Sequence, residues 1–114
     1  MENTKFLPVA EVADIADGAV AAAEIGGQAL VIYNLGGTFY ATEGYCTHGH
    51  AHLAEGYIEG GAIECSMHGG KFDIRSGKAV APPCRVDLKT YPVIVEGSRI
   101  LVAVPEALVA SEGE

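Results

Sequence analysis

Residues 46–70 read CTHGHAHLAEGYIEGGAIECSMHGG, and this stretch contains two short arms of the same composition. The first arm is Cys46-Thr47-His48, and the second, Cys65-Ser66-Met67-His68, follows after sixteen intervening residues. Each arm supplies one thiolate and one imidazole. Two such loops can place both sulfurs on one metal and both imidazoles on another, as in a two-iron cluster in which His replaces Cys on one iron. The quartet Cys46, His48, Cys65 and His68 is therefore the candidate metal-binding and cofactor-binding site.

The same four side chains also suit a single tetrahedral zinc ion. Zinc sites of this composition usually pair their cysteines with each other and their histidines with each other, whereas each arm here mixes the two types. Gly49 and Gly69-Gly70 directly follow the two histidines. A residue without a side chain at these positions lets backbone N–H groups approach bridging sulfides. The pattern favours the two-iron cluster, and a zinc-stabilised, non-redox interaction module is the alternative.

Upstream of the two arms, the sequence predicts a β-meander. Residues 20–25, 29–35 and 38–42 are rich in apolar side chains, and the pairs Gly26-Gly27 and Gly36-Gly37 separate them. Two-residue glycine turns between such runs are typical of antiparallel hairpins. The meander is the clearest local signal in the chain.

The two ends of the chain carry weaker patterns. A short edge strand is predicted over residues 6–9, because Pro8 interrupts it, and one helical turn over residues 11–15. A second hairpin is predicted from residues 86–95 and 99–104, on either side of Glu96-Gly97-Ser98. Strands at both ends with the two arms between them suggest a site held on a sheet scaffold.

Size and charge narrow the function classes. The chain has 114 residues and a formal net charge of -8, which fits one domain and disfavours binding to nucleic acid or anionic lipid. The N-terminal region has no basic segment followed by an apolar run, and no stretch approaches about 18 apolar residues, so we expect neither export nor a membrane anchor. Three cysteines, an odd number, fit metal ligands or thiols better than a disulfide framework. A cytoplasmic location is expected.

Further motifs extend the pattern of the two arms over residues 42–102. They are Cys46-Thr47-His48-Gly49, Leu53, Gly56, Ile63-Glu64-Cys65, His68-Gly69, Phe72-Asp73, Ser76-Gly77, Pro82-Pro83 and Leu88-Lys89-Thr90-Tyr91-Pro92-Val93. On these residues the sequence resembles the Rieske 2Fe-2S family, and within it the small ferredoxins that serve bacterial aromatic-ring-hydroxylating dioxygenase systems. The resemblance implies that Cys46 and Cys65 bind the inner iron of one 2Fe-2S cluster per chain, that His48 and His68 bind the outer iron, and that Pro82-Pro83 covers the cluster.

The resemblance also implies the fold. We expect an all-β chain with the Rieske (ISP) fold, which is an antiparallel β-sandwich or barrel base with an inserted cluster-binding subdomain. Residues 1–114 then form a single Rieske domain, with the cluster-binding insertion at approximately residues 44–83. The C-terminal tail, residues 105–114, has too little pattern for an assignment.

The family also contains high-potential members whose cluster loops share a disulfide and whose cluster accepts Ser and Tyr hydroxyl hydrogen bonds. The corresponding residues here are Ala51 and Met67 for the disulfide, and Gly70 and Phe72 for the hydroxyls. The resemblance therefore implies a soluble, low-potential carrier that passes single electrons from a flavin-dependent ferredoxin reductase to a terminal Rieske non-haem iron oxygenase. A protein like the small subunit of nitrite reductase is a further alternative, although those relatives often lack the cluster ligands.

The chain is not expected to be an enzyme by itself. A terminal oxygenase also needs a mononuclear iron held by two His and a carboxylate, and only His50 and His52 remain beyond the quartet. Both are expected on a solvated loop, and Cys84 is expected to be a packing residue. Electrons are expected to leave at the tip formed by the two arms and Pro82-Pro83, with Glu43, Glu55 and Glu59 as candidates for an acidic rim.

Overall fold

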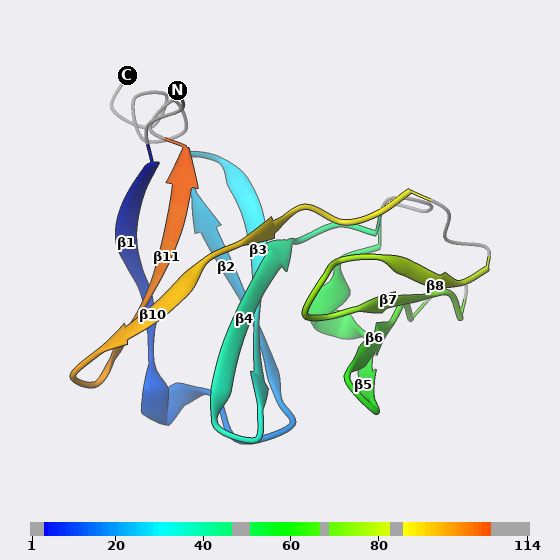
Figure 1. Cartoon of the computed structure of the whole chain (residues 1–114), viewed down its shortest axis with the longest axis horizontal. Coiled ribbons are helices and arrows are strands. Elements are labelled where there is room, and N and C mark those ends of the chain that lie inside the picture. Colours follow the sequence, from blue (N-terminus) through cyan, green and yellow to red (C-terminus); the bar gives the residue numbers. More distant parts are fainter. Residues whose placement is uncertain (1–3, 47–50, 67–68, 83–85, 106–114) are drawn as a thin grey trace.

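Three antiparallel sheets make up most of the regular structure in the computed structural model of the chain (Figure 1). The structure describes residues 4–46, 51–66, 69–82 and 86–105. Within these residues the helical segments are two short 3-10 helices, and no helix is long and apolar enough to cross a membrane. In chain order the elements are β1 (Thr4–Glu11), η1 (Val12–Asp14), β2 (Val20–Ile25), β3 (Gln28–Leu35), β4 (Thr38–Glu43), η2 (Leu53–Glu55), β5 (Tyr57–Glu59), β6 (Ala62–Glu64), β7 (Lys71–Asp73), β8 (Ala79–Ala81), β9 (Thr90–Tyr91), β10 (Val93–Glu96) and β11 (Arg99–Pro105).

Two of the sheets form a base, which lies on the left of Figure 1. Their strand orders are β1-β11-β10 and β2-β3-β4-β9. The third sheet, in the order β5-β6-β7-β8, lies on the right and falls between β4 and β9 in the sequence. The all-β, antiparallel fold class expected from the sequence is confirmed.

The predicted meander is present with both glycine turns. Ile25 pairs with Gln28, and Leu35 pairs with Thr38, so each turn has two central residues. Those residues are Gly26 and Gly27 (φ 57° and 80°) and Gly36 and Gly37 (φ 64° and 94°). A turn with positive φ at both central residues matches the twist of the flanking strands, and glycine reaches this conformation without a steric penalty.

The N-terminal strand is longer than the pattern predicted. It runs over β1, at the edge of its sheet, and its register with β11 shifts between Pro8 and Ala10. Proline lacks an N–H, so an edge strand with an irregular register tolerates it. The helical turn expected over residues 11–15 is η1.

The strand predicted over residues 86–95 is partly wrong. Residues 86–89 are not in a strand, and the remainder is divided into β9 and β10, which belong to different sheets. Pro92 stands at the division and has no N–H to continue a ladder. The following hairpin is present, but Glu96 pairs with Arg99, so the turn itself is Gly97-Ser98.

Strand β3 is buried on both faces and joins two hydrophobic cores. Because successive side chains on a strand point to opposite faces, Leu30 and Ile32 pack into the core of the base. Val31 and Tyr33 pack on the other face, in a core that also contains side chains of the third sheet. The base thereby holds the third sheet through a shared apolar interface.

Candidate metal centre

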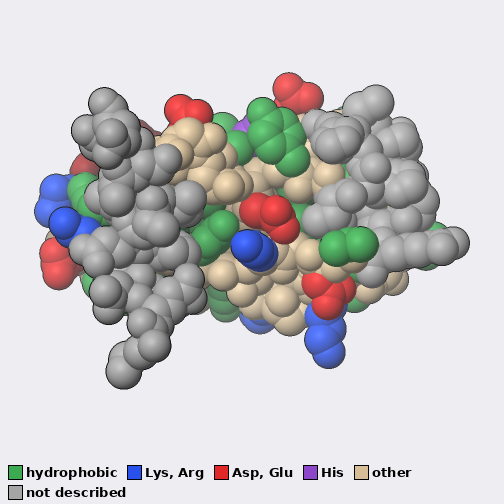
Figure 2. All heavy atoms as spheres, turned by 90° about the horizontal axis from the view of Figure 1, so that it is seen from above, with side chains coloured by type: hydrophobic (Ala, Val, Ile, Leu, Met, Phe, Trp, Pro, Cys, Tyr) green, Lys and Arg blue, Asp and Glu red, His purple; other side chains and the backbone are tan. Residues whose placement is uncertain are grey.

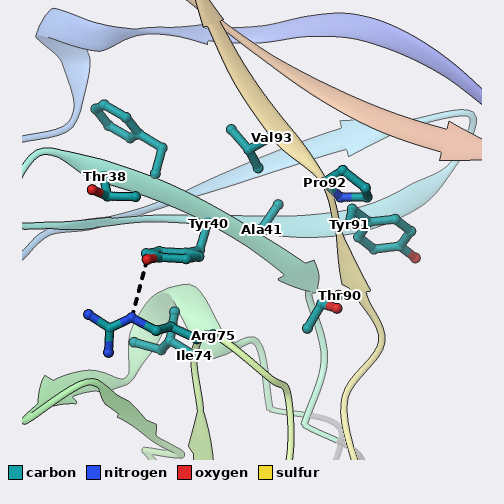
Figure 3. Close-up of a pocket in the computed structure, with 10 residues that line it drawn as sticks. Thr38, Tyr40, Ala41, Ile74, Arg75, Thr90, Tyr91, Pro92 and Val93 are labelled. Atoms are coloured by element: carbon teal, nitrogen blue, oxygen red, sulfur yellow. Dashed lines mark hydrogen bonds between the residues drawn. The ribbon is translucent and has the colours of Figure 1, made fainter.

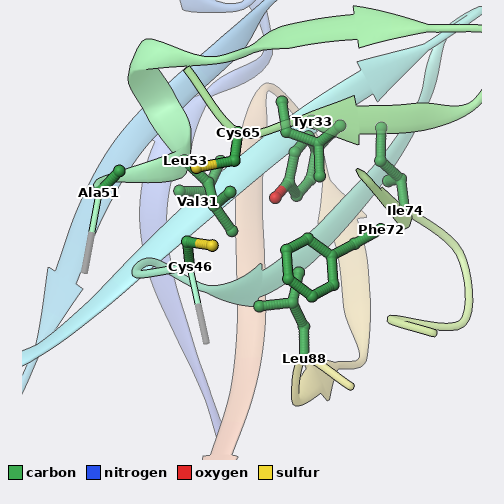
Figure 4. Close-up of a cluster of buried hydrophobic side chains, with 10 residues drawn as sticks. Val31, Tyr33, Cys46, Ala51, Leu53, Cys65, Phe72, Ile74 and Leu88 are labelled. Carbon is green, nitrogen blue, oxygen red and sulfur yellow. The ribbon is translucent and has the colours of Figure 1, made fainter. Parts of the chain in front are cut away.

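Two cysteines lie in the core that joins the base to the third sheet. Cys46 follows β4 and Cys65 directly follows β6, and their exposed fractions are 2% and 1%. Both belong to the same buried cluster, in which Val31 and Leu53 lie beside them (Figure 4). Neither of these two cysteines is in a disulfide. The fold therefore brings together the two thiols that the sequence predicts as ligands.

The loops that begin at these cysteines are closed in the same way. The Cys46 N–H donates to the carbonyl oxygen of Ala51, and the Cys65 N–H donates to that of Gly70, each at 2.8 Å. Each hydrogen bond joins residues five positions apart, so each cysteine stands at the base of a short loop. His48 and His68 lie within these loops but outside the described residues.

Glycine is required in the second loop by its backbone. Gly69 has φ +71° and its N–H donates to the Cys65 carbonyl oxygen at 3.2 Å. An L side chain rarely adopts this left-handed conformation. The glycine that the sequence places directly after His68 therefore fits a tight turn at the loop.

The first loop is held at its base by Tyr45 and His52. The two residues form an isolated antiparallel bridge, and their rings meet edge to face with centroids 5.0 Å apart. The His52 Nδ1 atom accepts a hydrogen bond from the Ala54 N–H at 3.1 Å and so caps η2. Sequence reasoning placed His52 on a solvated loop, but the structure gives the half-buried ring a capping role. The sequence signal for this capping role is a polar side chain directly before Leu53-Ala54-Glu55.

The segment that follows Pro82-Pro83 is anchored to both parts of the molecule. Glu43 Oε1 accepts from the Lys89 N–H at 2.8 Å, and the Glu43 N–H donates to the Lys89 carbonyl oxygen at 2.9 Å. The Leu88 N–H donates to the Gly77 carbonyl oxygen at 2.7 Å. Pro83 and Cys84 lie outside the described residues. The expected third loop is thus flanked by fixed backbone, and its cover over a cluster stays a prediction.

The surroundings of the two thiols are apolar. Phe72 and Tyr33 are fully buried in the same cluster, and the Tyr33 hydroxyl lies 2.8 Å from Thr42 Oγ1. Thr42 Oγ1 donates to the Glu43 carbonyl oxygen, so the Tyr33 hydroxyl is the donor of the pair. Burial raises the pKa of Tyr33 well above its ordinary value, which keeps the phenol neutral.

This donor set fits a metal centre. A thiolate in an apolar core is unfavourable unless a cation compensates its charge, and thiolates are the preferred ligands of iron–sulfur clusters. Within the ranges that the structure describes, no three His, Cys, Asp or Glu side chains converge, and both predicted histidine ligands fall outside those ranges. The two cysteines of the quartet share one buried core, and their role as metal ligands stays a prediction.

A family model described as the Rieske [2Fe-2S] domain matches residues 5–92 of the chain. The chain belongs to the Rieske [2Fe-2S] domain family. Rieske membership confirms the family that the two arms and the flanking motifs indicated.

Relatives of this Rieske chain are named as ferredoxins. The ferredoxin component of the naphthalene 1,2-dioxygenase system of Pseudomonas putida is 40% identical over 100 residues, which are 88% of this chain and 96% of the relative. The structure of the Sphingomonas yanoikuyae B1 ferredoxin is similar with a TM-score of 0.84 and 41% identity, over 89% of this chain and all of that one. A complex of reduced oxygenase and oxidized ferredoxin in carbazole 1,9a-dioxygenase contains a chain with a TM-score of 0.81 and 38% identity, over 86% of this chain and 92% of that one.

The acidic side chains of this Rieske chain differ in their partners. On the face shown in Figure 2, several acidic side chains lie next to Lys or Arg side chains. Glu43 is engaged by the Lys89 backbone, and Glu59 forms a 2.6 Å ion pair with Lys71 that lowers the pKa of Glu59. Among the described residues, Glu55 is the one of the three candidate rim acids whose carboxylate has no partner in the structure.

A groove separates the base from the third sheet of this Rieske domain (Figure 3). It has a volume of about 570 Å³, and its walls come from β4, β9 and the residues Ile74 and Arg75. Arg75 Nε donates to the Tyr40 hydroxyl at 3.2 Å, and the guanidinium carbon lies 5.6 Å from the centre of the Tyr40 ring. Arg75, next to the third sheet, thus links this part of the domain to Tyr40 of the base.

Proposed function

We propose that this Rieske chain is a one-electron carrier, the ferredoxin component of an aromatic-ring-hydroxylating dioxygenase system. The observation that carries the proposal is the pair of buried thiols, Cys46 and Cys65, at the bases of two loops with matching closure. A bound 2Fe-2S cluster supplies reversible one-electron chemistry at such a site. The relatives are named as ferredoxin components, which supports a carrier rather than an enzyme that transforms a substrate.

The quartet Cys46, His48, Cys65 and His68 is proposed to hold one cluster per chain. Cys46 and Cys65 are buried, so they are assigned to the inner iron. His48 and His68 follow them within the same loops and are assigned to the outer iron, nearer the solvent. Ser66, which is exposed, stands between Cys65 and the second histidine and is not needed as a ligand.

The proposed partners are a flavin-dependent reductase as electron donor and a terminal oxygenase as electron acceptor. The similarity to the ferredoxin of the carbazole 1,9a-dioxygenase complex supports the second partner, because that ferredoxin is complexed with its oxygenase. The cytoplasmic location expected from the odd number of cysteines is part of the same proposal.

The potential is proposed to be low within the Rieske range. Gly70 has no side chain, and Phe72 is fully buried and has no hydroxyl, so neither donates a hydroxyl hydrogen bond to a cluster sulfur. Fewer such hydrogen bonds leave the reduced cluster less stable. We therefore expect a midpoint potential of about -150 mV. A value above about +100 mV in a redox titration would place the chain with the high-potential class.

Metal analysis and reconstituted turnover test the function together. The purified protein is expected to contain iron and acid-labile sulfide at about two each per chain and to give a Rieske-type electron paramagnetic resonance signal on reduction. Stoichiometric zinc without labile sulfide would favour the zinc-stabilised module. With a flavin-dependent reductase and an aromatic-ring-hydroxylating oxygenase, omission of this chain is expected to abolish product formation, and unchanged turnover without it would refute the carrier role.

A further inference from the structure

A carboxylate lies against the second cluster loop. Glu64 is the last residue of β6 and directly precedes Cys65. Its side chain is half-buried, and its Oε2 atom lies 3.9 Å from the position that a Cβ on Gly69 would take. Gly69 belongs to the loop that the Cys65–Gly70 hydrogen bond closes. The Glu64 carboxylate is therefore a charge beside the backbone of the loop that contains His68.

The cross-strand cation opposite Glu64 is bound to another acid. Lys71 pairs with Glu64 in the β6–β7 register, but the Lys71 Nζ atom donates a hydrogen bond to Glu59 Oε1 at 2.6 Å. The pKa of Lys71 is raised mainly by that hydrogen bond and by attraction to the Glu59 charge, while attraction to Glu64 contributes least. The other cross-strand neighbour of Glu64 is Tyr57, which is exposed and neutral. Lys71 therefore compensates the Glu64 charge only in part.

We propose that Glu64 is a residue that sets the reduction potential of the metal centre, by holding a negative charge beside the second loop. The proposal rests on the proposed function. With two ferric ions, two sulfides, two thiolates and neutral imidazoles the cluster is formally neutral, and one added electron makes it negative. A fixed negative charge nearby repels the added electron, and a half-buried charge is screened less than an exposed one. Glu64 thus lowers the reduction potential further than the absence of hydroxyl donors does by itself.

The test is a redox titration of the cluster-loaded protein, followed by electron paramagnetic resonance. Glu64→Gln keeps the shape of the side chain and removes its charge, so the midpoint potential is expected to rise. Lys71→Gln leaves both Glu59 and Glu64 uncompensated, so the potential is expected to fall. Glu96→Gln removes the same charge at the far end of β10, next to the turn of the base hairpin, and is the matched control that is expected to leave the potential unchanged.

The salt dependence of the potential is a second readout, and a purely structural role of Glu64 would not produce it. The difference in potential between the wild type and Glu64→Gln is expected to shrink as ionic strength rises, because salt screens charge interactions. Two results overturn the proposal: an intact cluster in Glu64→Gln with a shift no larger than that of Glu96→Gln, or a potential in Lys71→Gln that does not fall. If Glu64→Gln does not assemble a cluster, Glu64→Ser, which also removes the charge, takes its place in the comparison with Glu96→Gln. A wild-type protein without iron and labile sulfide refutes the proposed function instead.

Discussion

Gly56 lies directly beneath the carbonyl oxygen of Glu64, so closely that a Cβ on Gly56 would overlap this oxygen. Gly56 ends η2, which follows the first cluster loop, and Glu64 precedes Cys65 at the start of the second. The contact therefore couples the two loops through backbone alone. A side chain at position 56 would therefore push apart the backbone that follows the first loop and the backbone that precedes the second.

Gly56→Ala is expected to destabilise the fold and loosen the cluster loops. The added methyl group meets backbone, which cannot rotate away, and overpacking of this kind costs roughly 1–3 kcal/mol. The measurement is thermal or urea unfolding of the loaded protein, with visible absorption reporting cluster loss. Gly18→Ala is the control, since Gly18 has φ +81° but nothing within 4 Å of an added Cβ, and its cost is about 1 kcal/mol of backbone strain. Equal losses in the two variants would contradict the coupling.

Replacement of the predicted ligands separates the quartet from the other Cys and His residues. His68→Ala and Cys46→Ser are expected to lose or destabilise the cluster, because each removes a ligand from an iron. Cys84→Ser and His50→Ala are expected to keep its spectrum, because the quartet already completes both irons. Iron and sulfide content and electron paramagnetic resonance provide the measurement. Cluster loss in Cys84→Ser would show that the ligand assignment is wrong.

Acid is expected to weaken the turn that follows β7. Asp73 Oδ2 accepts hydrogen bonds from the Ser76 hydroxyl at 2.8 Å and the Ser76 N–H at 2.9 Å, and these bonds lower the pKa of Asp73. In the unfolded chain the Asp73 carboxyl has a pKa of about 3.9, so it binds the proton more tightly there than in the folded chain. The stabilisation is therefore present above that value and is lost as the pH falls through the lower, folded pKa.

The corresponding measurement is the unfolding midpoint as a function of pH for wild type and Asp73→Asn. The wild type is expected to lose more stability than the variant as the pH falls below about 5, because only the wild type has this carboxylate. The effect is small, since the group is largely solvated. Parallel curves for the two proteins would show that the Asp73–Ser76 turn does not contribute.

The strands of the base can be predicted from the sequence more clearly than the strands of the third sheet. Gly26-Gly27 and Gly36-Gly37 mark two-residue turns between long apolar runs, so β2, β3 and β4 can be predicted from local pattern. Strands β5 to β8 have three residues each, which is too short for an alternating pattern to stand out. Their inward side chains, including Ile63 and Phe72, become recognisable only when they pack under β3.

The candidate site shows the same division. That Cys46 and Cys65 lie in one buried core could be predicted, because ligand chemistry requires particular residue types at particular spacings. Their role as ligands stays a prediction. The role of Glu43 could not be predicted, because its carboxylate meets the backbone of Lys89, forty-six residues later. The pairing of Glu59 with Lys71 likewise depends on the sheet register and not on sequence proximity.

These partners change the expectation for docking to the oxygenase. Of the three acids that flank the first loop in sequence, Glu43 holds the Lys89 backbone and Glu59 is offset by Lys71, whereas Glu55 is exposed and has no partner among the described residues. An uncompensated exposed charge next to the loops contributes most to the encounter rate with a partner of opposite charge. Glu55→Lys is therefore expected to slow single-turnover reduction of the oxygenase at low salt, with the difference from wild type disappearing at high salt.

Glu96→Lys is the matched control for this charge reversal. It changes the charge by the same amount on the base hairpin and is expected to leave the rate unchanged. Pro83→Glu tests the apolar centre of the same surface and is expected to slow reduction at both salt concentrations, since a buried charge weakens the complex itself. If Glu55→Lys and Pro83→Glu both retain the cluster and reduce the oxygenase at the wild-type rate, docking does not use the tip formed by the cluster loops.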